Sequence, residues 1–136
     1  MGLVLVPFLV VGPLLVVAYN AELFGGRVHT DAGFALAWGA FPLLTAYVAQ
    51  AATVAAPAVL GAAAAFALSY AQRTLSTPAR RLRREVQRVE GTMIMANGTI
   101  ERIDQTALLA PLERTLHALA WSMVALAAAL VVARMY

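Results

Sequence analysis

The sequence predicts an all-α membrane protein with four transmembrane helices, plus a small cytoplasmic amphipathic helix and a β-hairpin between spans three and four. The first observation is composition, because 62% of the 136 residues are hydrophobic and only 12% are charged, whereas soluble domains carry about 25% charged residues. The second is distribution: Met1–Ala21, Ala32–Gln72 and Thr115–Ala133 contain no acidic residue, lysine or arginine. One span needs about 20 apolar residues, so the middle stretch accommodates two spans.

The first three spans fill residues 1–72, with a cytoplasmic loop at 20–31. Span one, Leu3–Tyr19, is interpreted as a mature helix because it lacks the basic start of a secretory signal and no Ala-x-Ala cleavage site follows it. Asp31 is a suitable N-cap for span two, which continues to about Ala49. After a short turn, Pro57 fits the first helical turn of span three, which runs to Gln72.

Residues 73–110 are the polar segment expected to carry the basic helix and the hairpin. Thr77 and Pro78 fit the N-cap and first position of a basic amphipathic helix that reaches about Glu90. Asn97-Gly98 lies between β-prone runs and predicts a two-residue hairpin with a type I′ turn. Asp104 is the expected N-cap of a last helix, which passes Pro111 and forms span four in residues 111–136.

The arginines predict the orientation in the membrane. All ten basic residues are arginines, and nine of them lie in the loop at 20–31 or between Arg73 and Arg114. The positive-inside rule places both segments in the cytoplasm and both chain ends outside, with only Arg134 on the outer side. Abundant alanine and the absence of lysine are typical of a bacterial gene of high GC content, which indicates the bacterial cytoplasmic (inner) membrane.

The loop at 20–31 has an unusual density of polar chemistry for a turn between two membrane helices. Glu22 and Asp31 could hold Mg²⁺, which prefers oxygen ligands. Arg27 could bind a diphosphate oxygen, and Gly25-Gly26 allows a tight backbone turn beside it. The alternative interpretation is a capped, salt-bridged turn at the lipid headgroups.

Span two contains a second group of polar and small residues. Gly39 and Thr45 permit close approach of another helix. Tyr47 and Gln50 lie near the outer interface, where an aromatic belt is the alternative explanation. Together with Pro42, these residues form the spacing Gly-x-x-Pro-x-x-Thr-x-Tyr-x-x-Gln.

A helix end with a tyrosine, a basic loop, and a helix with Gly39, Pro42, Tyr47 and Gln50 resemble the middle of the UbiA superfamily of intramembrane prenyltransferases, with its naphthoate branch the most similar. The resemblance covers roughly Leu14–Gln72. It implies that the chain binds or transfers an isoprenoid diphosphate or a quinone-like lipid, with Mg²⁺ as the cofactor. It implies these substrate-binding residues: Asn20, Glu22, Arg27, His29, Asp31, Tyr47 and Gln50.

The sequence departs from this family in ways that bear on catalysis. The family binds its diphosphate through two aspartate-rich motifs, and the segment after span three has arginines at Arg80, Arg81, Arg83 and Arg84 instead. No catalytic residue is therefore assigned, and no metal site is assigned from the residues themselves. The chain is also shorter than a complete enzyme of this kind, so we expect a half-length relative, a fragment from an internal start, or a diverged relative that has lost the chemistry.

Two further features have a functional and a plain interpretation. The arginines expected to bind an anionic lipid or a diphosphate are Arg80, Arg81, Arg84 and Arg88. The alternative is that they only set the membrane topology. His29 and His117 both lie on the predicted cytoplasmic side, as a bis-histidine haem would require. Two histidines in a helix bundle are more often hydrogen-bonded structural residues.

The second functional hypothesis is a non-catalytic small membrane subunit or scaffold. It would use the basic helix and the hairpin to dock a membrane protein partner, a second copy of the chain or an anionic lipid. In both hypotheses the principal partner is the lipid bilayer. The net charge of +3 is modest and confined to one segment, so no nucleic acid partner is expected. A convergence of Glu22, Asp31 and Glu101 around Arg27 would favour the enzyme.

Overall fold

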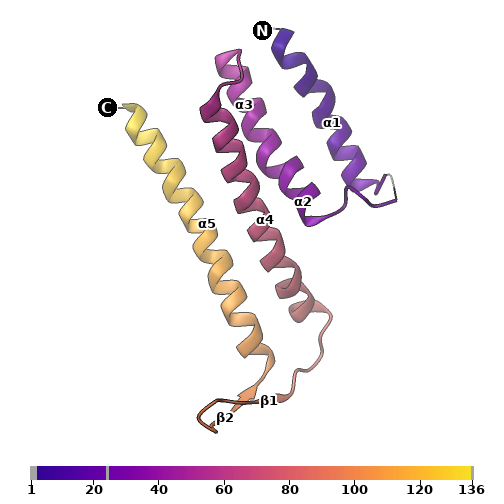
Figure 1. The fold of residues 1–136 in the computed structure, drawn as a ribbon, viewed down its shortest axis with the longest axis vertical. Coiled ribbons are helices and arrows are strands. Elements are labelled where there is room, and N and C mark those ends of the chain that lie inside the picture. The colour runs from indigo at the N-terminus through magenta and orange to yellow at the C-terminus, as the bar shows by residue number, and fades with distance from the viewer. Residues whose placement is uncertain (1–2, 24, 136) are drawn as a thin grey trace. The chain divides into compact units, whose positions relative to one another are not determined.

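The computed structural model describes residues 3–23 and 25–135, and it is helical apart from one hairpin (Figure 1). The chain divides into two compact units, an N-terminal unit, Met1–Arg73, and a C-terminal unit, Thr74–Tyr136. In the described part of the chain, three helices are long and apolar enough to cross a membrane: Leu3–Asn20, Asp31–Ala51 and Gln105–Met135. These properties are consistent with a multi-pass membrane protein.

In the N-terminal unit, a short 3₁₀ turn, η1 (Leu3–Leu5), leads into α1 (Val6–Asn20). After the loop comes a continuous rod of α2 (Asp31–Phe34), η2 (Ala35–Ala40) and α3 (Phe41–Ala51), in which η2 is π-helical. The rod and α1 lie side by side, and the rings of Phe8 and Phe41 stack with centroids 5.7 Å apart (Figure 1).

The start of the rod corrects one prediction. Thr30, not Asp31, is the N-cap, because its hydroxyl accepts a hydrogen bond of 3.0 Å from Gly33 N. Asp31 is instead the first helical residue, where its negative charge still favours the positive end of the helix dipole. Thr30 has the extended backbone that an N-cap requires, with φ −118° and ψ 167°.

The helix α4 (Ala56–Arg84) begins in the N-terminal unit and ends in the C-terminal unit. It includes the predicted third span but is not among the candidate spans, so the described structure supports three of the four. Its apolar part consists mainly of alanine, and Ser69, Tyr70 and Gln72 follow within the same helix. Alanine contributes less hydropathy than the leucine and valine of α1, which explains the difference.

No helix begins at Pro78, so the predicted separate basic helix from Pro78 to Glu90 is wrong. Pro78 lies inside α4, although a proline there removes one hydrogen bond and costs about 3 kcal/mol. Pro78 is exposed, and Ala79, the next residue, is buried. The helix stops at Arg84, and Gln105 Nε2 donates to the Leu82 carbonyl near its end at 2.6 Å.

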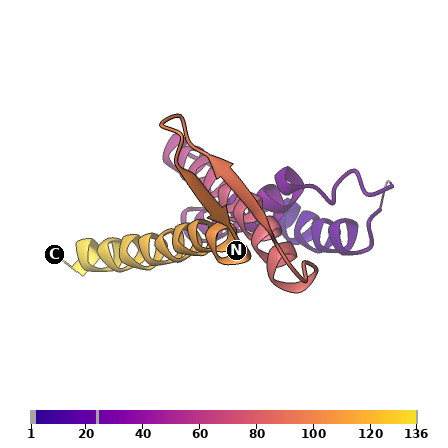
Figure 2. The same cartoon turned by 90° about the horizontal axis from the view of Figure 1, so that it is seen from below.

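The predicted hairpin is present in the C-terminal unit, between α4 and the last helix (Figures 1 and 2). Strand β1 (Gly91–Ile94) pairs antiparallel with β2 (Ile100–Ile103). Helix α5 (Gln105–Met135) follows and passes through Pro111, as predicted. Asp104 is confirmed as its capping residue, because its Oδ1 accepts from Ala107 N at 2.8 Å.

The hairpin loop differs from the predicted two-residue type I′ turn. Met95 N donates to Thr99 O, and Gly98 N donates to Met95 O, both at 2.8 Å, so the loop contains residues 96–98. Asn97 is not among the residues with positive φ, whereas Gly98 has φ +84°. The loop is therefore a type I turn followed by a left-handed glycine. The strand register agrees with this three-residue loop, because Ile94 lies opposite Ile100. A two-residue loop would place Ile94 opposite Glu101.

Candidate functional site

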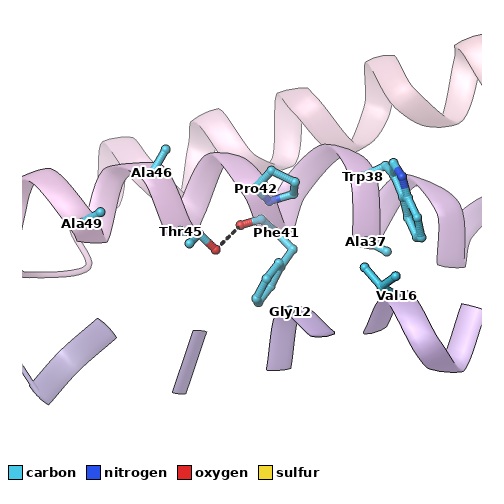
Figure 3. A pocket seen from close by; sticks show the side chains of 9 residues that line it. All are labelled: Gly12, Val16, Ala37, Trp38, Phe41, Pro42, Thr45, Ala46 and Ala49. Atoms are coloured by element: carbon cyan, nitrogen blue, oxygen red, sulfur yellow. Dashed lines mark hydrogen bonds between the residues drawn. The ribbon is translucent and has the colours of Figure 1, made fainter. Parts of the chain in front are cut away.

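An apolar groove lies between α1 and the rod of α2, η2 and α3 (Figure 3). Its volume is about 480 Å³. Nine residues line it: Gly12, Val16, Ala37, Trp38, Phe41, Pro42, Thr45, Ala46 and Ala49. Only two of these side chains carry a polar group, the indole N–H of Trp38 and the hydroxyl of Thr45. The Thr45 hydroxyl donates to the Phe41 carbonyl at 2.8 Å. The groove therefore suits an apolar ligand.

Small side chains create this groove. Ala46 and Ala49 lie one helical turn apart along α3, and neither fills the space in front of it (Figure 3). On α1, a Cβ at Gly12 would lie 3.3 Å from Phe41 Cε1, so the absence of a side chain at Gly12 leaves room for the Phe41 ring. In membrane proteins small residues usually let two helices pack closely. Here they leave part of the helix–helix boundary open.

Trp38 connects the groove to an aromatic cluster of Tyr19, His29, Phe34 and Trp38. Tyr19 is buried at 7% exposure, and its ring centroid lies 4.5 Å from that of His29 and 4.8 Å from that of Trp38. Phe34 stacks on Trp38 at 5.7 Å. His29 Nδ1 is also 3.2 Å from the Tyr19 carbonyl oxygen. The cluster thus fixes the loop at 20–31 against the helices on either side of it.

An ion pair adjoins this cluster. Arg73 Nε lies 3.4 Å from Asp31 Oδ1, and the Arg73 guanidinium lies 5.2 Å from the centre of the Phe34 ring. The Arg73 side chain is only 21% exposed. The pair ties α4 to the first turn of α2. Sequence reasoning did not include Arg73, although it is the first charged residue after the long uncharged stretch and would need a partner at such depth.

The other predicted substrate-binding residues do not line the groove. Asn20 donates from Nδ2 to the Val16 carbonyl at 2.8 Å and is otherwise exposed. Glu22 has a left-handed backbone, with φ +49°, and Arg27 is exposed. Tyr47 is partly buried and Gln50 exposed, both on the same helix as Ala46 and Ala49 but outside the groove lining.

The residues of the described chain do not fit the Mg²⁺ site that the family resemblance implies. The carboxylate of Asp31 faces Arg73, and Glu22 is exposed. Within residues 3–23 and 25–135, no group of three or more histidine, cysteine or acidic residues is placed to hold a metal ion. The geometry near the groove therefore supports binding of an apolar molecule and identifies no group for its chemical conversion.

Comparison with family models, with curated protein sequences and with solved structures found no match to this chain.

Proposed function

We propose that the N-terminal unit binds the apolar chain of an isoprenoid lipid, on a scaffold related to the UbiA prenyltransferases. The ligand class is a prenylated quinone or an isoprenoid diphosphate. The observation that carries the proposal is the groove, whose volume lies within the range of about 300–1,000 Å³ of small-molecule sites. At the end of α1 the aromatic cluster presents the exposed rings of Trp38 and His29, which a ring-containing headgroup would contact, while Tyr19 is buried against both rings.

Trp38 provides a direct probe of binding, because it lines the groove and is 41% exposed. The second tryptophan, Trp121, is replaced by phenylalanine so that emission reports Trp38 alone. Titration of a short-chain prenylated naphthoquinone into the protein in lipid nanodiscs should quench Trp38 saturably. Farnesyl diphosphate should reverse the quenching if both ligands use the groove.

A groove-filling variant supplies the control. Ala46→Phe places a ring in the groove and should abolish saturable quenching, because the space for the chain is occupied. Ala63→Phe adds the same ring at an exposed position of α4 in the same unit, outside the groove lining, and should bind like the parent protein. Equal binding by the two variants would contradict the proposal.

Arg27 tests whether the ligand carries a diphosphate. The N-terminal unit has two arginines, and Arg73 already contacts Asp31, whereas Arg27 forms no ion pair with a described residue. Arg27→Ala should weaken farnesyl diphosphate binding about tenfold, since a charge-assisted hydrogen bond contributes about 1.5–3 kcal/mol. Quinone binding should not change. Arg134→Ala, near the end of α5, is the matched control.

The proposal includes a membrane topology of four spans, in which α4 is the third span in chain order. Both polar segments lie in the cytoplasm of a bacterium, and both chain ends lie outside. This topology is supported by the arginine distribution. The chain has no cysteine, so single cysteines can be introduced at Thr53 and Thr77. A membrane-impermeant maleimide should label the first in intact cells and the second only after permeabilisation. Labelling of position 77 from outside would contradict the topology.

The second candidate function is a small membrane subunit without catalysis. The observation that favours it is the hairpin, where Ile94 and Ile100 face each other across the strands and are 75% and 67% exposed. A two-stranded hairpin is only marginally stable in water unless something covers it. Ile94→Ser with Ile100→Ser should then remove the protein from a larger assembly on native gels of solubilised membranes. Quinone binding should persist in that variant.

A further inference from the structure

The end of α4 carries four arginines within one and a half helical turns: Arg80, Arg81, Arg83 and Arg84. They differ in whether an acidic residue neutralises them. Arg83 contacts Glu113, and Arg81 lies 3.8 Å from Glu85. Beyond the helix, Arg88 contacts Glu90. Arg80 and Arg84 form no ion pair with any residue in the described ranges, and both are exposed.

Arg80 and Arg84 are also placed to act together. They are four residues apart in α4, which puts them on the same side of the helix, one turn from each other. Two guanidinium groups at this spacing present several N–H donors to one phosphate group, and arginine matches phosphate geometry well. A helix C-terminus also favours positive charge, and this effect alone would explain arginines there without any ligand. The experiment must separate the two explanations.

The depth of the pair in the membrane follows from α5. Glu113, the partner of Arg83, lies two residues before the uncharged stretch Thr115–Ala133 of a candidate span. At about 1.5 Å per residue, Glu113 is about 3 Å from the hydrocarbon region. The headgroup layer on each side of a bilayer is about 5–8 Å thick. At the same helix end, Gln105 Nε2 donates to the Leu82 carbonyl, and Gln105 lies ten residues before Thr115, or about 15 Å from the hydrocarbon region. The end of α4 that carries Arg80 and Arg84 therefore lies between about 3 and 15 Å from the hydrocarbon region, a range that includes the headgroup phosphates.

We propose that Arg80 and Arg84 together bind the phosphate of an anionic phospholipid on the side of the membrane where α4 ends. This narrows the set expected from the sequence, because Arg81 and Arg88 already have acidic partners.

The test measures which phospholipids remain bound to the full chain. The protein is reconstituted in an equimolar mixture of phosphatidylglycerol and phosphatidylcholine, extracted in mild detergent, and analysed by native mass spectrometry. The parent protein should retain phosphatidylglycerol preferentially. Arg80→Gln with Arg84→Gln should reduce this preference at least tenfold, since each arginine near an anionic surface contributes about fivefold.

The matched control removes the same charge from paired positions. Arg81→Gln with Arg88→Gln should keep the preference within about twofold, because these arginines are already neutralised by Glu85 and Glu90. Equal losses in the two double variants would show a general charge effect and overturn the proposal. Absence of any preference in the parent protein, or displacement of the lipid by inorganic phosphate, would also overturn it.

A third variant addresses the helix-dipole explanation. Arg80→Lys with Arg84→Lys keeps both positive charges at the helix end but removes the planar forks that match a phosphate. Its helix content and unfolding midpoint should equal those of the parent protein, while the lipid preference falls to an intermediate value. If the dipole alone explained these arginines, Arg80→Gln with Arg84→Gln would lower the unfolding midpoint and leave the lipid preference unchanged, and that result would overturn the proposal.

Discussion

The two units differ in where their charge and their packing lie. The N-terminal unit has two arginines and two acidic residues, and it contains all the buried hydrophobic residues of the described chain except Ala79. The C-terminal unit has eight arginines and five acidic residues, so the net charge of +3 resides there entirely. Helix α5, with 31 residues, has no buried residue.

This difference shows that hydrophobic residues have two roles in one chain. In the N-terminal unit, small residues such as Gly39 and Ala62 let helices approach closely, which is how membrane helices gain stability without a hydrophobic driving force between them. In α5, leucine and valine side chains remain exposed and match lipid instead of another helix. Polar contacts, such as Arg83 with Glu113, hold the end of α4 to α5.

The largest expected effect is at Gly39. A Cβ there would lie 2.4 Å from Ser69 Oγ and 2.6 Å from the Ala65 carbonyl oxygen, so η2 and α4 would have to separate. Gly39→Ala should therefore lower the free energy of unfolding by about 1–3 kcal/mol, as overpacking does. Circular dichroism during denaturation in mixed micelles measures this. Gly91→Ala in the C-terminal unit is the control.

At Gly91 the added Cβ would meet only Ile103 Cβ, at 3.9 Å, which is an ordinary contact. The change in unfolding free energy should stay within about 0.5 kcal/mol. Equal losses at the two glycines would break the comparison, because close packing would then be no more important in the N-terminal unit than in the C-terminal one.

A smaller difference is expected between the two ion pairs. Arg73 is 21% exposed and also contacts the Phe34 ring, whereas the side chain of Arg83 is 63% exposed. Arg73→Gln should cost about 1–2 kcal/mol, since it removes a partly desolvated cation–π contact and an ion pair. Arg83→Gln should cost less than about 1 kcal/mol. Double-mutant cycles with Asp31 and Glu113 measure both couplings.

Salt sharpens this prediction. Raising the ionic strength to about 1 M reduces the screening length to about 3 Å. The coupling of Arg83 with Glu113 should fall toward zero, and that of Arg73 with Asp31 should persist in part because its groups are less exposed. A larger and more salt-resistant coupling at Arg83 than at Arg73 would contradict the comparison, because the better shielded ion pair would then lie in the C-terminal unit.

The sequence predicted the elements whose causes are local. Uncharged stretches located α1, the α2–α3 rod and α5, and the capping role of Asp104 followed from its residue type. The prediction of a helix start at Pro78 was wrong because a proline signals a helix boundary only on average. In α4 the neighbouring alanines and arginines favour a helix strongly enough for it to continue.

The groove was not predicted, because no single residue specifies it. It depends on the contact of Gly12 in α1 with Phe41 in α3. It also depends on Ala46 and Ala49, which line the boundary between these two helices. The loop at 20–31 was predicted to bind substrate because of its residue types, yet Arg27 and Glu22 are exposed there and lie outside the groove lining. The pairing of Asp31 with Arg73 was accessible in principle, since two consecutive antiparallel helices would bring the residue at the start of the first near the residue about 40 positions later in the second.

The smallest expected effect is in the hairpin loop, where two turn types make opposite predictions. A type I′ turn needs positive φ at both Asn97 and Gly98, so Asn97→Gly would be neutral or stabilising. In the observed loop only Gly98 has positive φ, and Asn97 Oδ1 accepts a hydrogen bond of 3.0 Å from Thr99 N. Asn97→Gly should then cost about 0.5–1 kcal/mol through lost backbone restriction and the lost hydrogen bond.

Gly98→Ala completes the pair. It should cost about 1 kcal/mol, because alanine has to adopt a left-handed backbone there, although nothing lies within 4 Å of the added Cβ. Hydrogen exchange of the Met95 and Thr99 amides measures these changes within the loop, because both amides donate hydrogen bonds there. The fluorescence of Trp38, in the other unit, should not change. Slower exchange after Asn97→Gly would restore the two-residue turn, and it would require Ile94 to face Glu101 instead of Ile100.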